Sequence, residues 1–434
     1  MKTTSNLRTL LGLALLAPLA TAACSGDLAP PPEARSGLAY DTAPTVAPSD
    51  YQALVAGDNA FAADLYQQIR GDGTKNLFFS PNSISVALAM TSAGANGDTA
   101  SQIADVMHYT LPPARLHPAM DRLALDLASR GADATSGKLP FEMHQMDALW
   151  GQKDYAIESP FLDTLSTSYD AGVYQLDFGT DPDGSRKTIN AWVADQTDGH
   201  IKDLLGAPDV TALTRLVLTN AIYFQAAWAT PFDPADTAPA AFTTATGTVT
   251  VDTMHETGMY AYAEATDVQA IELGYDGGDL ALDIFLPTGT GAAALTTFEA
   301  SLTGDRITSL LGSLTPNTQV QLSLPKASFT AALSLKDTLS AMGMPIAFIA
   351  GSADFSGITT VEPLHIDAVQ HKGFIAIDEE GTQAAAATAV SIGAGTAAPS
   401  GLLMQVNHPY VILLRDLKSG AILFVGRVSD PSQS

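Results

Sequence analysis

Cysteine is almost absent from this sequence: Cys24 is the only one in 434 residues. A disulfide framework within the chain is therefore excluded, and so is a zinc site built on paired cysteines. The 8 histidines are scattered along the chain without an HExxH motif. We therefore expect no metal site and no cofactor.

Basic residues are also scarce. The chain has 21 Lys and Arg against 46 Asp and Glu, which gives a formal net charge of −25. Such a surface repels phosphate backbones and anionic lipid. We expect no nucleic-acid partner, no heparin-like polyanion partner, and no membrane contact other than through a covalent lipid.

The motifs of common catalytic sites are missing. The sequence contains no G-x-S-x-G elbow, no G-x-x-x-x-G-K-[ST] loop and no G-x-G-x-x-G turn. Gly289-Thr290-Gly291 leads into an alanine-rich helix and does not form a phosphate-binding loop. Serine, histidine and aspartate residues are plentiful, but no spacing links them. The sequence therefore predicts a protein that is not an enzyme.

An apolar run near the N-terminus is too short to span a bilayer. Lys2 and Arg8 precede the apolar residues Leu10 to Leu19, which is the pattern of a signal peptide. We interpret residues 1–23 as this signal peptide. The chain is therefore expected to be exported.

The way in which this leader is cleaved is open between two alternatives. Cys24 follows Thr21-Ala22-Ala23, which resembles a bacterial lipoprotein processing site in which Cys24 is lipidated, although the usual leucine three residues before the cysteine is replaced by Thr21. Cleavage after Ala20-Thr21-Ala22 also fits an A-x-A site. The first predicts a lipid anchor at the cell surface or outer membrane, and the second a secreted protein.

The composition changes after the leader. Residues 24–50 are rich in proline and alanine, which predicts a stiff, extended tether without a core. Residues 51–434 have alternating helix and strand patterns. Because 46% of the chain is hydrophobic and 15% is charged, we expect this part to bury a sizeable core in an α+β domain.

Patterns within this domain predict individual elements. An apolar stripe from Leu54 to Ile69 predicts a helix that begins before Leu54 or is capped at Asp58 or Asn59. Further expected helices are Pro81 to Met90, Ile189 to Gly199 and Leu333 to Met342, and expected strands are Leu77 to Phe79, Leu216 to Phe224, Val320 to Pro325 and a hairpin within Leu273 to Pro287.

The most unusual stretch runs from His371 to Ser400. It opens as an alternating strand and passes the acidic residues Asp378-Glu379-Glu380. It then becomes a run of small residues from Gly381 to Ala398 that contains no proline. Read with period two, this run suits a central strand, but its glycines and alanines also suit a surface loop.

The segments HKGFIAIDEEGTQAAAAT and VNHPYVILLRDLKSGAILFVGRVSDP resemble the hinge and C-terminal strands of the serpin family. Other segments that resemble serpin signatures, in the family's order, are residues 76–90, 189–205, 218–228, 323–329 and 353–358. The resemblance covers residues 51 to 431. It implies the serpin fold, a mixed three-sheet α+β domain with helices and an exposed reactive-centre loop.

The resemblance also implies roles for individual residues. The hinge would comprise Glu379, Glu380, Gly381, Thr382, Gln383, Ala384, Ala385, Ala386, Ala387 and Thr388. The shutter beneath the main sheet would comprise Ser80, Ser83, Asn220 and His371. The breach at the top of that sheet would comprise Trp228, Lys326 and Glu379, with an ion pair between Lys326 and Glu379 as a latch.

The implied function is suicide inhibition of a serine protease, which would form a covalent complex with a monomer of this chain. Family spacing places the reactive bond at Gly395-Thr396, or one residue earlier at Ala394. The small residues there favour an elastase-like or subtilisin-like protease, whereas a cut between Leu402 and Met404 would favour a chymotrypsin-like one. The alternatives are a non-inhibitory carrier with the same fold and a surface interaction lipoprotein.

Overall fold

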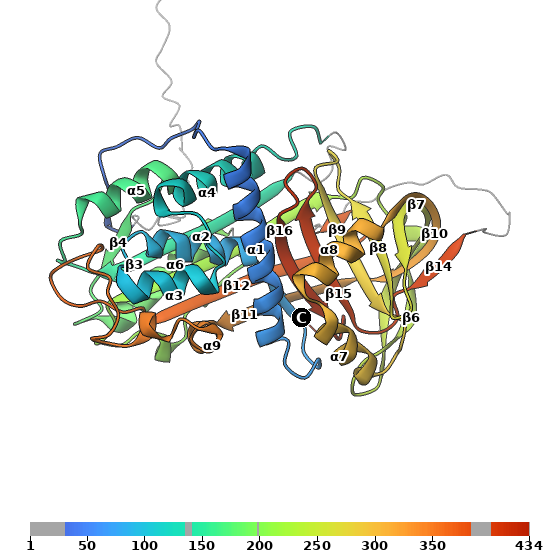
Figure 1. The fold of residues 1–434 in the computed structure, drawn as a ribbon. Helices are drawn as coiled ribbons and strands as arrows, with labels where there is room; N and C mark the ends of the chain where they lie inside the picture. The colour runs from blue at the N-terminus through green and yellow to red at the C-terminus, as the bar shows by residue number, and fades with distance from the viewer. Residues whose placement is uncertain (1–30, 135–140, 198, 383–400, 434) are drawn as a thin grey trace, which may run out of the picture. The chain divides into compact units, whose positions relative to one another are not determined.

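The computed structural model describes residues 31–134, 141–197, 199–382 and 401–433. Helices cover two β-sheets in this part of the chain (Figure 1). The helices are α1 (Pro48–Ile69), α2 (Pro81–Ser92), α3 (Gly97–Val106), α4 (Pro113–Ala128), α5 (Ser159–Tyr169), α6 (Pro182–Gln196), α7 (Ala292–Ser301), α8 (Gly304–Ser313) and α9 (Lys336–Met342). Within the described ranges, no helix is both long and apolar enough to cross a membrane.

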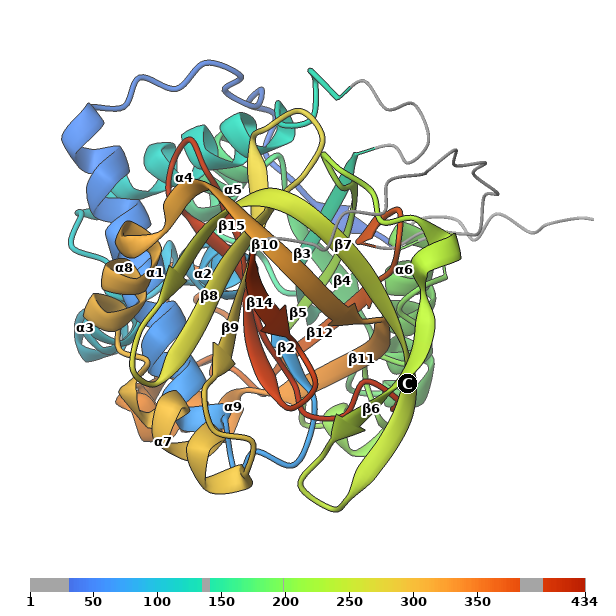
Figure 2. The ribbon, with the colours of Figure 1, turned by 90° about the vertical axis from the view of Figure 1, so that its right-hand side faces the viewer.

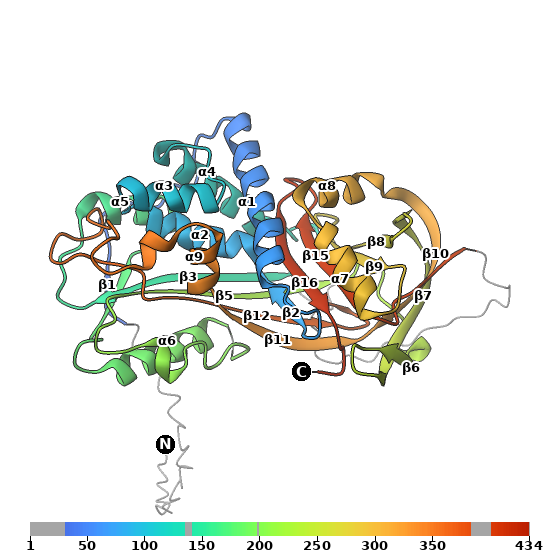
Figure 3. The same cartoon turned by 60° about the horizontal axis from the view of Figure 1, so that its bottom comes forward.

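The first sheet has the strand order β1-β4-β3-β5-β13-β12-β11. Its strands are β1 (Glu33–Ala34), β3 (Glu142–Gln152), β4 (Val173–Leu176), β5 (Leu216–Ala227), β11 (Ala327–Ser334), β12 (Ala368–Ile377) and β13 (Gly381–Thr382). β5 is buried along almost its whole length, as expected for a strand with both faces covered. Figure 3 shows α6 on one face of this sheet and α2, α3, α4 and α5 on the other.

The second sheet has the order β14-β10-β7-β8-β9-β15-β16-β2, with β6 paired to β7. Its strands are β2 (Leu77–Phe79), β6 (Ala238–Thr243), β7 (Thr248–Glu264), β8 (Val268–Gly274), β9 (Leu280–Pro287), β10 (Thr315–Pro325), β14 (Leu402–Gln405), β15 (Tyr410–Asp416) and β16 (Ile422–Val428). β7 is long enough to pair with β10 and then with β8, so the expected second and third sheets are continuous through it (Figure 2).

The main hydrophobic core lies between these two sheets. It joins residues of β5 and β12, such as Ile222, Phe224 and Ile375, to residues of the second sheet, such as Phe424 and Leu282. The rings of Phe224 and Phe424 lie 5.9 Å apart. The core therefore packs against the centre of the first sheet, on the face that is turned toward the second sheet.

α1 begins at Pro48, which agrees with the alternative that this helix starts before Leu54 and not with a cap at Asp58. The Asp58 carboxylate is buried within the helix and accepts bonds from Ser85 Oγ at 2.6 Å and Asn82 Nδ2 at 3.1 Å. Two other element boundaries differ from those predicted. α6 begins at Pro182, because Asp181 caps it by accepting a bond from the Gly184 amide at 2.9 Å. Residues 333 and 334 belong to β11, and α9 begins only at Lys336.

Residues that precede the predicted domain start at residue 51 also contact the domain. The compact unit that holds the described chain begins at Pro31. β1 pairs with β4, Tyr40 donates a bond to Asp121 Oδ1 at 2.6 Å, and the Asp41 amide donates to the Thr167 carbonyl at 2.9 Å. The prolines keep this segment extended as predicted, but the extended chain is packed along the domain surface.

Candidate functional site

The two strands at the centre of the first sheet, β5 and β12, are paired over only part of their length. Their parallel register runs from Val217–Ala368 to Ile222–Gly373. Above this point no register joins them in the described residues, and β13 lies between their upper ends. β5 and β12 are therefore paired at the end that begins with Val217 and Ala368, called the lower end below, and separated at the other, upper end.

Residues Gly381 and Thr382 of the expected hinge form β13. They pair antiparallel with Ala227 and Ala226 of β5, and Thr382 also pairs with Ile377 of β12. A Cβ atom at Gly381 would lie 2.1 Å from the Ala226 carbonyl oxygen, so only glycine fits there. The start of the hinge is thus already a short strand of this sheet.

Thr382 is the last residue described before the reactive-centre segment. Its side chain is buried, and its hydroxyl lies 2.5 Å from the Tyr275 hydroxyl. The remaining predicted hinge residues (Gln383, Ala384, Ala385, Ala386, Ala387 and Thr388) and the predicted reactive-bond residues (Ala394, Gly395 and Thr396) lie outside the described residues, as does Cys24.

Trp228 fixes the turn between β12 and β13. Its backbone amide donates to the Glu380 carbonyl, and its indole Nε1 donates to the Asp378 carbonyl, both at 2.9 Å. Its ring stacks on Tyr275 with 4.7 Å between centroids. The predicted breach residue therefore orients the hinge through bonds to its backbone, and Tyr275, which the sequence did not indicate, completes the contact with Thr382.

The expected ion pair between Lys326 and Glu379 is present. Lys326 Nζ lies 2.6 Å from Glu379 Oε2, and Thr237 Oγ1 donates to Glu379 Oε1 at 2.8 Å. Burial disfavours the charged carboxylate, but these hydrogen bonds outweigh it and lower the pKa of Glu379. Glu379 thus joins the start of β11 to the hinge turn and to the loop before β6.

The predicted shutter residues are brought together under the point where β5 and β12 part. His371 and Asn220 are direct register partners. The Ser80 amide donates to His371 Nε2 at 3.2 Å, so His371 carries its proton on Nδ1 and donates it to Asn220 Oδ1. Burial lowers the pKa of His371 to about 3, so the ring stays neutral. The Ser80 side chain instead caps α2 by accepting a bond from the Ser83 amide, 3.1 Å away.

Asp147 of β3 ends this chain of hydrogen bonds, and the sequence did not identify it. It is the register partner of Asn220 on the side opposite His371. Asn220 Nδ2 donates to Asp147 Oδ1 and to Ser83 Oγ, Ser83 Oγ lies 3.4 Å from Oδ1, and Gln145 Nε2 donates to Oδ2 at 2.6 Å. Burial nevertheless raises the pKa of Asp147 to about 7. The only signal in the sequence was a carboxylate between two apolar residues, Met146 and Ala148.

The site contains the parts of a sheet that can accept a strand and no arrangement for catalysis. The polar side chains of the shutter lie near the point where β5 and β12 separate; Ser83, Asn220 and His371 bond to other elements, whereas the Ser80 side chain bonds to the start of α2. In the described part of the chain, no three His, Cys, Asp or Glu side chains are grouped so that they could hold a metal ion.

Comparisons with known proteins agree with this architecture. The family model "Serpin (serine protease inhibitor)" matches residues 56–431. An uncharacterized serpin-like protein of Thermococcus kodakarensis is 36% identical over 402 residues, which cover 90% of each chain. Human Serpin B3 is 34% identical over 400 residues, covering 87% of this chain and 99% of that one. The structure of Serpin48, described as a highly specific serpin of the insect Tenebrio molitor, superposes with a TM-score of 0.77 at 28% identity, covering 89% of this chain and 99% of that one.

Reversing the charge of Glu379 tests the latch. In Glu379→Lys, two ammonium groups would meet where an ion pair holds the hinge turn, and the bond from Thr237 would be lost. We expect the upper sheet to open and the monomer fraction that remains after mild heating to fall at least about twofold, measured by size-exclusion chromatography. Glu380→Lys, which changes the neighbouring residue outside the ion pair, is the matched control. An unchanged monomer fraction in Glu379→Lys would count against the latch.

Asp147→Asn tests how much the buried Asp147 carboxylate lowers the stability of the fold. Its folded-state pKa of about 7 exceeds the value of about 3.9 for an unfolded aspartate. The folded state holds this proton more tightly than the unfolded state does, so the free energy of unfolding of the wild type falls as the pH rises from about 4 to about 7. Asparagine does not titrate, so the free energy of unfolding of the variant does not fall for this reason. We expect Asp147→Asn to raise the free energy of unfolding by up to about 4 kcal/mol at pH 8 and by little near pH 4.

Denaturant unfolding at both pH values measures this difference. Asp305→Asn, at an exposed position of α8, is the control and should show no pH-dependent gain. An equal effect of Asp147→Asn at both pH values would show that the carboxylate is not the source of the cost.

Proposed function

Because this chain belongs to the serpin family, whose members are generally serine protease inhibitors and not enzymes, we propose that it traps a serine endopeptidase as a suicide substrate. The protease attacks one peptide bond of the segment after Thr382 and forms its acyl-enzyme. The released segment then inserts between β5 and β12 and carries the protease with it.

The observation that carries this proposal is the position of β13. Its two residues already pair antiparallel with β5, and Thr382 pairs with β12. An inserting segment continues this strand downward between the same two neighbours. The first turn and the first pairs are therefore formed before cleavage, and insertion needs no new nucleation step.

Insertion replaces the hydrogen-bond ladder between β5 and β12 with two ladders, one between the inserted strand and each of these neighbours. The parallel register between Ala368–Val217 and Gly373–Ile222 must open, and each neighbour then pairs with the new strand. If about 12 residues insert at about 0.5–1.5 kcal/mol per net hydrogen bond, the gain is on the order of 10 kcal/mol. This is comparable to the whole stability of a typical domain, which is enough to distort an attached protease.

The small residues around the expected reactive bond, Gly395-Thr396, support a protease with a shallow specificity pocket. No arginine or lysine lies between Gly381 and Met404, which argues against trypsin-like targets. We therefore propose an elastase-like or subtilisin-like target, bound by a monomer of this chain.

A denaturing gel tests the trapping mechanism. After brief incubation with pancreatic elastase or subtilisin, a band at the summed mass that survives boiling is expected, and mass analysis of the released C-terminal peptide identifies the bond. Cleavage without such a band by elastase, subtilisin and chymotrypsin would overturn the inhibitory function and favour a carrier or surface-binding role.

Variants of Thr382 separate loop insertion from simple binding. Thr382→Arg places a charged side chain at a buried position beside Tyr275, so we expect insertion to slow and the ratio of cleaved to trapped inhibitor to rise at least about tenfold. Thr382→Ser keeps the hydroxyl and should trap as well as the wild type. Equal trapping by both variants would contradict insertion at this point.

We propose in addition that the chain is exported and anchored through a lipid on Cys24, after removal of residues 1–23. The proline- and alanine-rich residues that follow Cys24 would then connect the lipid to the domain. In a bacterial host, the wild type should incorporate labelled fatty acid and remain with the membrane fraction. Cys24→Ser should lose the label and appear in the soluble fraction. Labelling of Cys24→Ser, or an unlabelled wild type, would contradict the anchor.

A further inference from the structure

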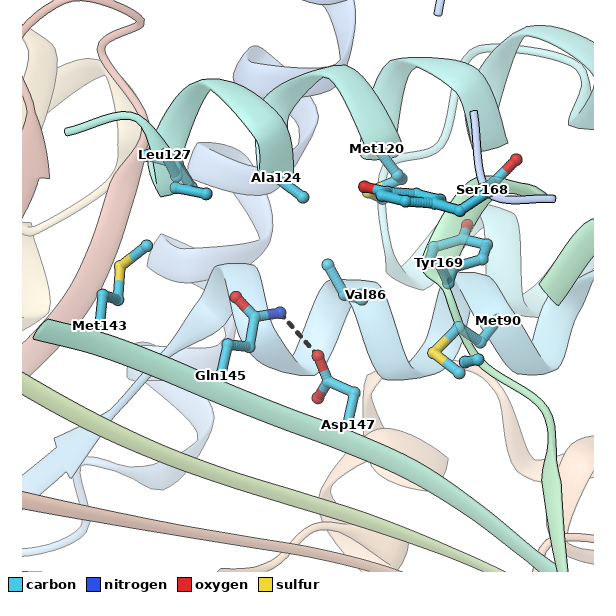
Figure 4. A pocket seen from close by; sticks show the side chains of 13 residues that line it. Val86, Met90, Met120, Ala124, Leu127, Met143, Gln145, Asp147, Ser168 and Tyr169 are labelled. Atoms are coloured by element: carbon cyan, nitrogen blue, oxygen red, sulfur yellow. Dashed lines mark hydrogen bonds between the residues drawn. The ribbon is translucent and has the colours of Figure 1, made fainter. Parts of the chain in front are cut away.

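A cavity of about 250 Å³ lies between β3 and the helices that cover this face of the sheet. Figure 4 shows its walls, which come from α2, α4, α5 and β3. Apolar side chains form most of the lining, and they include Val86, Met90, Met120, Ala124, Leu127 and Met143. The volume exceeds the roughly 150 Å³ that admits benzene and lies below the range of about 300–1,000 Å³ for drug-sized ligands. The cavity is therefore of a size for one aromatic ring or a short branched chain.

The polar groups of the cavity come mainly from β3. Gln145 and Asp147 extend from this strand into it (Figure 4). Asp147 has an intermediate exposure although it lies deep between the sheet and the helices. Among the described contacts, its Oδ2 accepts a bond only from Gln145 Nε2, at 2.6 Å, so further acceptor capacity remains on that oxygen.

Asp147 also lacks a cation. Within the described ranges, no lysine, arginine or histidine side chain forms an ion pair with it, and none lines the cavity. A second carboxylate stands close behind the wall, because Tyr40, which lines the cavity, donates a bond to Asp121 Oδ1 at 2.6 Å. Most of the cavity lining is thus apolar, and the charged group in it is the Asp147 carboxylate on β3.

We propose that this cavity binds a small organic ammonium ion, with its apolar body against the helices and its N–H groups on Asp147. A cation would supply the charge partner that the carboxylate lacks, and the low local dielectric strengthens that pairing. An anion of the same shape would meet the Asp147 carboxylate, with the Asp121 carboxylate behind Tyr40. A neutral molecule would bury its apolar body but leave Asp147 unpaired. The site lies outside the hinge and shares the Asp147 carboxylate with the shutter, and ligand binding there is measured independently of protease trapping.

Three probes that share one phenyl ring and a two-carbon side chain test the charge preference: 2-phenylethylammonium, 2-phenylethanol and phenylacetate. Titration of the full chain by calorimetry or ligand-observed NMR at about pH 8, where Asp147 is ionised, should show saturable binding of the ammonium ion. We expect its affinity to be at least about tenfold higher than that of the alcohol, and no binding of the carboxylate.

Two variants locate the site. Asp147→Asn should lower the affinity for the ammonium ion at least about tenfold. Because Asp147 also belongs to the shutter, Ala124→Phe provides a second test: it fills the cavity from α4 and leaves the carboxylate intact, so it should abolish binding. The matched controls are Asp305→Asn and Ala300→Phe, at exposed positions of α8 and α7, and both should bind as the wild type does.

The proposal is overturned if 2-phenylethylammonium does not bind, if it binds no more tightly than 2-phenylethanol, or if Ala124→Phe retains the affinity of the wild type. Binding that is lost in Ala124→Phe and in Asp147→Asn, but not in the two controls, supports it.

Discussion

The central sheet depends on one constraint: β5 and β12 must be neighbours at one end and apart at the other. Their register ends at Ile222–Gly373, and the hinge residues Gly381 and Thr382 occupy the opening above. The shutter lies at the paired end and the bonds of Trp228 and Glu379 lie at the open end. Each group of contacts therefore acts on the same pair of strands from opposite sides of the point where they separate.

Hydrogen-bond direction gives the shutter a definite order. A backbone amide donates to His371, His371 donates to Asn220, and Asn220 donates to Asp147. His371 lies on β12, whereas Asn220 lies on β5 and Asp147 on β3, so separation of β5 from β12 would break the bond between His371 and Asn220 but leave Asn220 bonded to β3. The same Asp147 carboxylate faces the cavity between β3 and the helices, so one residue belongs to the shutter and to the proposed binding site.

Much of this arrangement could be predicted, because the signature segments of the family lie in the sequence in order. Serpin signatures located Ser83, Asn220 and His371, and the alternation of residues 373–377 indicated a strand. Asp147 could not be found in this way, since its partner Asn220 lies 73 residues away and no local pattern records a cross-strand neighbour. The contacts that residues 31–50 make with the domain could not be predicted for a related reason. Proline predicts an extended backbone, but only the folded positions of Asp121 and Thr167 decide whether that backbone is packed.

The short strand β1 has a consequence for how this sheet meets other molecules. β1 covers the outer edge of β4 with only two residues, and the chain leaves the sheet directly after it. A sheet whose middle can open is exposed to strand exchange between molecules, and an unprotected rim would add a second route to it. By covering that rim with a short edge strand, the N-terminal segment limits intermolecular pairing at this end of the sheet, whereas β11 forms the edge at the other end.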